Sequence, residues 1–297
     1  PLRPPTKEEW DNDALQTKRA FVTLGVMCAS FFTVGVMSAD EASSAHVASW
    51  VSNSPGSASR TLLSCVAAAF MCVEFWTLFF SASVPPAMKG DAKWHATKVF
   101  GHGVFLTTQL AALQTFHSCI SAVVEANQLW KLFASSSTSV LGPAAVESAA
   151  LFVYSTSVFT ASIGVTLTVL FLALCWFDSA WQKDVRVVNE ARGYPGFGAI
   201  MLLQHIPSAF VGLADIYLGL KDPLLRSHLS PSLPSLCCTA LGYSATYVTF
   251  LHFNYSINGG VFPYPFLALL KGPAQWVAFT AVITVFISVI MAVFGGT

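Results

Sequence analysis

Thr107 and His205 lie in apolar stretches that contain few other polar side chains. A threonine hydroxyl is a weak nucleophile at neutral pH, and it becomes useful when a neutral imidazole accepts its proton. A carboxylate can hold that imidazole in the correct tautomer, and Glu74 is the buried acid that the sequence offers for this task. The three residue types together predict acyl transfer, with Thr107 as nucleophile, His205 as general base and Glu74 as the acid that orients it.

The depths of these residues agree if each apolar stretch is a helix that crosses a membrane. At about 1.5 Å per residue, Thr107 and His205 lie roughly 10 and 13 Å from the same membrane face, and Glu74 lies about 15 Å from it. Gln114 follows Thr107 by seven residues, so it lies on the same helix face about two turns further in. Gln114 and Gln204, the residue before His205, are the predicted substrate-binding residues.

Each candidate also has a structural interpretation. Threonine hydroxyls in spanning helices commonly bond to their own helical turn, and single intramembrane histidines commonly serve packing or hydrogen bonding. The partner of Glu74 is either His205 or a serine on a neighbouring helix, because a buried carboxyl needs a partner or a proton. His117 and Asp215 are expected near the opposite membrane face, and His252 near the face from which the depths above are counted.

The elements that must position these residues follow from composition. The chain is 54% hydrophobic and 10% charged, whereas soluble domains are about 25% charged. Seven apolar runs reach the length of about 20 residues that a spanning helix needs. They are 20–39, 62–84, 100–123, 151–177, 196–219, 234–254 and 274–295. An open sheet cannot satisfy its backbone in lipid, so we expect an all-α, multi-pass transmembrane helix bundle of about seven spans.

The chain divides into three parts on this basis. Residues 1–19 form a polar N-terminal arm, 20–61 an additional transmembrane helix and its loop, and 62–297 a six-helix core. With seven spans, eleven of the fifteen Lys and Arg residues fall on the side of the N-terminus. Because basic residues favour the cytoplasmic side, the N-terminus is expected on the cytosolic or matrix side of its membrane.

Several classes of protein are disfavoured. The formal net charge is zero, which makes nucleic acid an unexpected partner, and no glycine-rich phosphate loop occurs. The seven cysteines contain no CxxC pair, so we expect neither a metal site nor a cofactor. A transporter or receptor remains an alternative, but the chain shows no inverted repeat and no row of acids that would form an ion path.

Four short motifs resemble one known family, the androgen-induced and androgen-dependent TFPI-regulating proteins. The first runs from Thr107 to Gln114, and the second is an apolar run that begins at His205 and ends in Leu-Ala-Asp215. Phe177-Asp178 and Tyr264-Pro-Phe-Leu267 follow the same pattern. The resemblance covers about residues 62–295.

The resemblance implies an intramembrane threonine hydrolase of fatty acid esters of hydroxy fatty acids, located in the endoplasmic reticulum, with Thr107 and His205 as its catalytic pair. The expected partners are membrane lipids and a lipid-ester substrate. Leu110 and Leu202 stand where the family has polar residues. The alternative is therefore a structural or accessory subunit of a large membrane complex, in the mitochondrial inner membrane or another organelle, which contacts other subunits through residues 1–39.

Overall fold

The computed structural model describes residues 7–37, 39–54, 56–80, 97, 99–133, 141–179, 182–183, 186, 198–218, 221–229 and 231–295. Throughout these ranges the chain folds into helices joined by turns, and they contain no strand. The expected all-α fold is confirmed.

The helices in chain order are α1 (Lys7–Met37), α2 (Glu41–Asn53), α3 (Ala58–Phe80), α5 (Leu106–Phe133), α6 (Pro143–Phe171), α8 (Gly198–Leu203), α9 (Pro207–Tyr217), α10 (Pro223–Leu229), α11 (Leu233–Ile257) and α12 (Pro273–Gly295). Two 3-10 turns, η2 (Gly101–Val104) and η4 (Pro265–Leu269), precede α5 and α12. One π-helical turn, η3 (Leu172–Trp176), ends α6.

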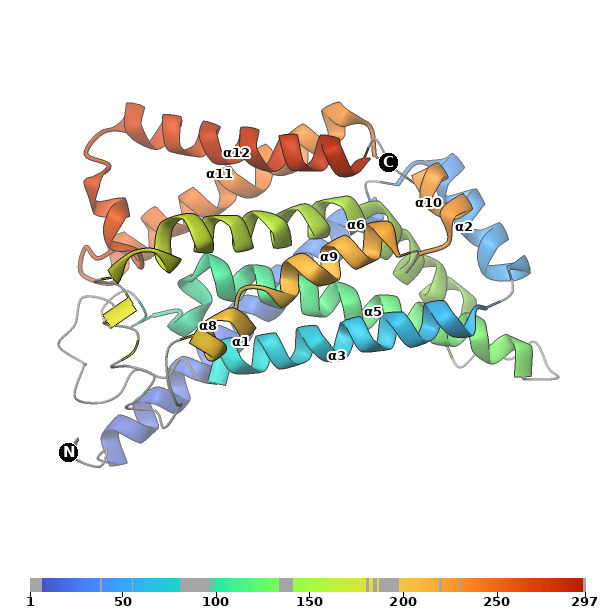
Figure 1. The fold of residues 1–297 in the computed structure, drawn as a ribbon, viewed down its shortest axis with the longest axis horizontal. Coiled ribbons are helices and arrows are strands. Elements are labelled where there is room, and N and C mark those ends of the chain that lie inside the picture. The colour runs from blue at the N-terminus through green and yellow to red at the C-terminus, as the bar shows by residue number, and fades with distance from the viewer. Residues whose placement is uncertain are drawn as a thin grey trace.

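The long helices run back and forth along one direction, and the short helices α2 and α10 lie together at one end of the bundle (Figure 1). Five stretches are long and apolar enough to cross a membrane. They are Ala14–Met37, Ala58–Leu78, Pro143–Phe171, Gly198–Tyr217 and Pro273–Phe294. Helices α5 and α11 run alongside them. They overlap the predicted runs 100–123 and 234–254, so each of the seven predicted runs contains helix. The chain is a multi-pass membrane protein.

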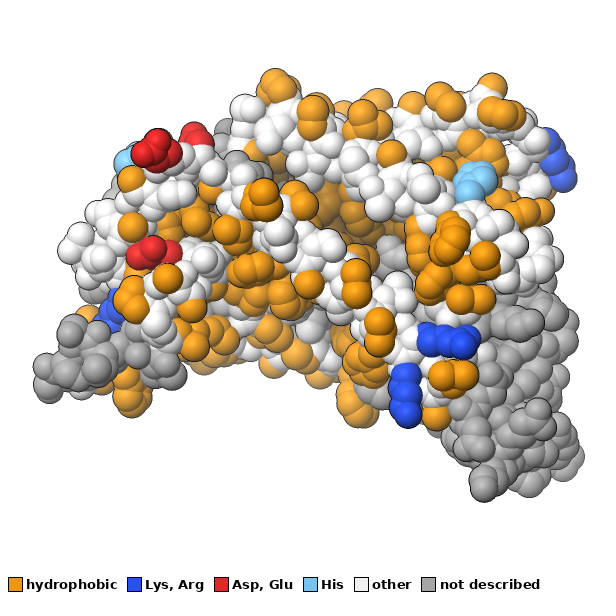
Figure 2. All heavy atoms as spheres, turned by 180° about the vertical axis from the view of Figure 1, so that it is seen from behind, with side chains coloured by type: hydrophobic (Ala, Val, Ile, Leu, Met, Phe, Trp, Pro, Cys, Tyr) orange, Lys and Arg blue, Asp and Glu red, His pale blue; other side chains and the backbone are white. Residues whose placement is uncertain are grey.

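The outer surface agrees with a membrane environment. Figure 2 shows apolar and uncharged side chains over the middle of the bundle, whereas the charged side chains lie toward its two ends. Charged groups are costly in the hydrocarbon core and are stable near the interfaces.

Helix α6 lies at the centre of the bundle, since 89% of its 18-residue apolar segment is buried. Its serine and threonine hydroxyls bond mostly to its own backbone, as Ser162 does to the carbonyl of Val158 at 2.7 Å. Small residues let α9 approach it closely: a Cβ on Gly212 would lie 2.8 Å from the Cα of Ala161. Such contacts are typical of membrane helices, which associate through close packing.

The structure corrects several predicted boundaries. The expected loop 124–150 is largely helical, because α5 continues to Phe133 and α6 begins at Pro143. The expected loops 40–61 and 220–233 contain α2 and α10. Hydropathy marks only the apolar part of a helix, so the predicted run ends where polar residues begin although the helix continues. In α2, the Asp40 side chain accepts a hydrogen bond from the Ser43 amide at 2.7 Å and caps the first turn.

Candidate functional site

The predicted span 196–219 is broken next to His205. Helix α8 ends at Leu203 and α9 begins at Pro207. Proline has no amide hydrogen, so it cannot donate to the carbonyl of Leu203, and the helix restarts with proline in its first turn. The backbone between the two helices therefore has polar groups that are free to bond to other helices, whereas a continuous helix would bond them within itself. The hydroxyl of Thr168 on α6 bonds to one of them, the carbonyl of His205, at 2.5 Å.

The ring of His205 is buried and contacts Phe171 and the backbone of Met201. It stacks on Phe171, with ring centroids 3.9 Å apart and planes 11° from parallel. Its Nδ1 lies 2.9 Å from the carbonyl oxygen of Met201. A carbonyl can only accept, so in this bond Nδ1 carries the proton and Nε2 keeps its lone pair. A neutral His205 thus has the tautomer of a general base that acts through Nε2.

Glu74 has a different partner from the one that would make it an orienting acid. Its carboxyl accepts a hydrogen bond from the hydroxyl of Ser208, and no hydrogen bond joins Glu74 to His205 in the described part of the chain. The serine alternative is therefore the one that the structure contains. The backbone carbonyl of Met201 holds the His205 ring instead of an acid.

Gln204 points to α3. Its amide nitrogen donates to the carbonyl of Thr77 at 3.0 Å, and this bond ties the end of α8 to the end of α3. Gln204 thus fixes the position of the chain just before His205. Its predicted contact with substrate stays a prediction.

Gln114 joins three helices. Its amide nitrogen donates to the carbonyls of Thr160 on α6, at 3.0 Å, and Ser208 on α9, at 3.1 Å. Gly164 makes this junction possible, because a Cβ there would lie 2.4 Å from the Gln114 amide nitrogen and 2.5 Å from the Ser208 carbonyl oxygen. The face of α5 that contains Gln114 therefore contacts α9 three residues beyond His205.

Thr107 is the second residue of α5 and is half-buried. It lies two turns before Gln114 on nearly the same face of the helix. Tyr264, in the connection between α11 and α12, places its hydroxyl at this helix start. The hydroxyl accepts from the Leu106 amide at 3.0 Å and interacts with the side chain and amide of Thr107. In the described residues no hydrogen bond joins Thr107 to His205, and their pairing stays a prediction.

Tyr264 is the site residue that sequence reasoning missed. Its Tyr-Pro-Phe-Leu motif served only as a marker of family resemblance. Burial raises the pKa of the Tyr264 hydroxyl above its ordinary value, so the group stays protonated at neutral pH and can donate. The signal available in the sequence was the proline that follows it, which is typical of a fixed turn.

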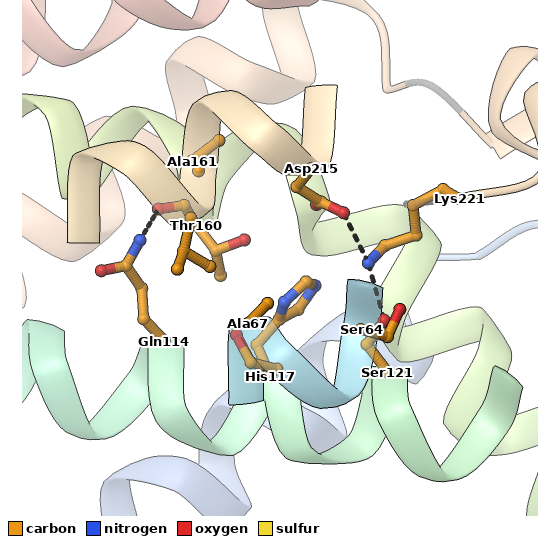
Figure 3. A pocket seen from close by; sticks show the side chains of 12 residues that line it. Ser64, Ala67, Gln114, His117, Ser121, Thr160, Ala161, Asp215 and Lys221 are labelled. Atoms are coloured by element: carbon orange, nitrogen blue, oxygen red, sulfur yellow. Dashed lines mark hydrogen bonds and ion pairs between the residues drawn. The ribbon is translucent and has the colours of Figure 1, made fainter. Parts of the chain in front are cut away.

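The expected interfacial residues divide into two groups. His252 is exposed. His117 and Asp215 are buried within the bundle (Figure 3), and the membrane depth expected for these three residues stays a prediction. Asp215 forms an ion pair with Lys221 at 2.8 Å, and Nε2 of His117 lies 3.0 Å from the carbonyl oxygen of Val153. Lys221, which lies beyond the end of α9, supplies the cation, and a count of depth along one helix cannot reveal this pairing.

Comparison with models of protein families matches residues 87–295 to the model described as FAR-17a/AIG1-like protein. The match begins after α3, so it excludes Glu74, and the resemblance was expected to begin earlier, at residue 62. Comparisons with curated proteins and with solved structures gave no match. The described residues contain no group of three or more His, Cys, Asp or Glu side chains that could hold a metal ion.

Proposed function

Because the chain belongs to the FAR-17a/AIG1-like family, we propose that it is an intramembrane hydrolase of lipid esters, of the type that joins a fatty acid to a hydroxy fatty acid. Thr107 is the nucleophile and His205 the general base. An apolar ester reaches them from the lipid, and no metal or cofactor takes part.

The reaction has two steps. In the first, Nε2 of His205 takes the proton of the Thr107 hydroxyl as its oxygen attacks the ester carbonyl. The bond from the acyl carbon to the alcohol oxygen breaks, and the leaving alcohol receives the proton from His205. In the second, water attacks the acyl-threonine, the acid is released, and the threonine oxygen regains a proton. The Tyr264 hydroxyl, which accepts from the Leu106 amide, keeps its own proton and is a donor near Thr107 that can stabilise the negative charge of the intermediate.

The observation that supports this proposal most is the bond from Nδ1 of His205 to the carbonyl of Met201. It selects the tautomer that a general base needs, without any acid. The Gln114 junction supports it further, because it brings the Thr107 face of α5 against the helix that follows His205.

The test uses purified protein in detergent with a lipid ester and a fluorophosphonate probe. We expect Thr107→Ala and His205→Asn to lose turnover by a factor of at least ~10³, and Thr107→Ser to keep part of it, in line with losses at catalytic pairs. Thr249→Ala is the matched control, because its exposed hydroxyl bonds only to its own turn on α11. Full turnover in Thr107→Ala would exclude the mechanism.

A second function, membership of a large membrane complex, is favoured by α1. This helix lies outside residues 87–295, which match the family model, and only 17% of its 18-residue apolar segment is buried. Its inner side packs on α6, where a Cβ on Gly35 would lie 2.9 Å from the Phe152 ring, so its outer side is free for lipid or another subunit. Extraction in a gentle detergent followed by a native gel tests this. Migration only as a monomer or dimer argues against it, and the two functions are compatible.

A further inference from the structure

A buried polar stripe follows one face of α5. Its members recur at intervals of three or four residues, which place them on one side of the helix. They are Gln114, His117, Ser118, Ser121, Glu125 and Gln128, all buried. Over about 21 Å, the length of fourteen residues, α5 thus directs hydrogen-bonding groups into the bundle interior. Such groups are costly inside a membrane unless they have partners.

A cavity follows the inner part of this stripe (Figure 3). Gln114, His117, Ser118 and Ser121 of α5 form one wall. The other walls belong to α3, α6 and α9 and to Lys221, which donates to the Ser121 hydroxyl at 3.0 Å. The lining is therefore polar on several sides, in the middle of a helix bundle.

Two side chains that line the cavity have polar atoms without a hydrogen-bond partner among the described residues. They are the carbonyl oxygen of Gln114 and the hydroxyl of Ser64, and both residues are 2% exposed. Nε2 of His117 donates to the carbonyl of Val153, so Nδ1 of that ring has a lone pair that can accept. The cavity thus offers acceptors and one hydroxyl to a small ligand that can both donate and accept hydrogen bonds.

The size of the cavity decides which ligand fits. The space open to the centre of a water molecule is about 20 Å³. A water molecule needs about 10–15 Å³ of such space and two to four polar partners, so there is room for about one or two waters and none for a lipid head group. We infer that this cavity binds ordered water and is the inner end of a water route into the bundle.

The route leads to the end of the bundle where α2 and α10 lie. From the cavity the stripe continues to Glu125, which is 3.3 Å from Arg60. Arg60 also lies 3.5 Å from Asp222, and these two side chains are 18% and 13% exposed, so they reach solvent. Buried polar side chains therefore recur along α5 from Glu125, beside Arg60, to Gln114 at the cavity.

At its inner end the route approaches the proposed catalytic residues. Gln114 donates to the carbonyl of Ser208, three residues after His205. This part of the inference rests on the proposed function, in which a water molecule must reach the acyl-threonine. Its oxygen forms the new bond to the acyl carbon, the bond to the Thr107 oxygen breaks, and His205 returns the water proton to that oxygen.

The test measures hydration directly, in the full chain reconstituted in lipid bilayers. Water-edited solid-state NMR records how fast magnetisation passes from water to a side chain. We expect the ring of His117 to receive it several-fold faster than Leu113, which is equally buried on α5 but packs in the apolar core. Ser64→Val fills the cavity and removes one polar partner, so it should reduce the rate at His117 to that of Leu113.

Cys65→Val is the matched control, because the neighbouring Cys65 on α3 is exposed and does not line the cavity. It should leave the rate at His117 unchanged. A rate at His117 as slow as at Leu113 in the unmodified protein would show that the cavity is dry and overturn the inference. This readout needs no enzymatic turnover, so a hydrated cavity in a protein that hydrolyses no ester would refute the proposed function and leave the water site standing.

Discussion

At the scale of single residues, the site depends on backbone carbonyls as much as on side chains. The ring of His205 bonds to the carbonyl of Met201, and the amide of Gln114 bonds to the carbonyls of Thr160 and Ser208. Backbone acceptors keep their positions as long as the helices do. The geometry around His205 is therefore a property of how α6, α8 and α9 pack, and substitutions that change this packing will affect it from a distance.

The bond between Ser208 and Glu74 gives the first prediction. Glu74 is fully buried, and its second carboxyl oxygen has no hydrogen-bond partner in the part of the chain that the structure describes. Ser208→Ala removes the remaining bond, so we expect the free energy of unfolding to fall by about 1–3 kcal/mol. Reversible unfolding in mixed micelles measures it.

Ser256→Ala is the control for this change, because the exposed Ser256 hydroxyl bonds to its own turn. It should alter the free energy by no more than about 0.5 kcal/mol. Combining Ser208→Ala with Glu74→Leu should cost less than the sum of the two single changes, since the leucine leaves no unpaired carboxyl. Strict additivity of the two changes would contradict the pairing.

At the scale of helices, the close contact at Gly164 gives the second prediction. A Cβ there would meet both the Gln114 amide and the Ser208 carbonyl. We expect Gly164→Ala to destabilise the protein by about 1–3 kcal/mol, as overpacking usually does. Gly242→Ala on α11 is the matched control. It has open space around it, and alanine is favoured over glycine in a helix by up to about 1 kcal/mol. Equal unfolding midpoints for the two variants would contradict the close packing of α5, α6 and α9.

The capping of α2 gives the third prediction, which concerns pH. Hydrogen bonds from Ser43 lower the pKa of the Asp40 carboxyl below its ordinary value of 3.8. Because the pKa is lowered, the cap stabilises α2 fully at pH values above the ordinary pKa. This stabilisation is lost as the pH falls through the lowered pKa. Hydrogen exchange of the α2 amides, corrected for intrinsic rates, should therefore accelerate several-fold in strong acid.

Asp40→Asn separates the cap from its charge. Asparagine keeps an acceptor for the Ser43 amide but does not titrate, so α2 should stay protected and show no acid-dependent change. Asp40→Ala should exchange faster at every pH. An acid response in Asp40→Asn as large as in the unmodified protein would exclude Asp40 as its source.

The sequence predicts the helices far better than their ends and contacts. Hydropathy locates the long helices because each one needs about 20 mostly apolar residues to cross the membrane, whether it faces lipid or other helices. It does not predict where α5 ends, because beyond residue 123 the helix carries the buried polar side chains Glu125, Asn127 and Gln128. The break before Pro207 is predictable from proline chemistry alone.

The candidate site was predictable in part. The types and depths of Thr107, His205 and Gln114 selected α5 and the break between α8 and α9, and the structure shows Gln114 at a junction with α9. Depth cannot say which side chains face each other around a helix, so the choice between His205 and Ser208 as partner of Glu74 needed coordinates. Lys221 and Tyr264 come from segments between spans, for which depth gives no information.

At the scale of the whole molecule, the alternation of helices gives the fourth prediction. Helix α1 begins at one end of the bundle and α12 finishes at the other (Figure 1). Tags added to the two termini should therefore face opposite sides of the membrane, the N-terminal tag facing the cytosol or matrix. Protease protection in sealed vesicles measures this. Two tags on the same side would require an even number of spans and contradict the seven-helix alternation.

The Gln114 junction also bears on how this chain can diverge. Both acceptors of its amide are main-chain atoms, so any residue at positions 160 and 208 can supply them. The hydroxyl at 208 has a separate use, which is to bond Glu74 on a helix outside the family match. A relative that lacks the acid at position 74 does not need serine at position 208. It still loses the bonds between α5, α6 and α9 if the glutamine at position 114 is replaced. Glutamine 114 should therefore persist across relatives in which the serine and the acid are replaced together.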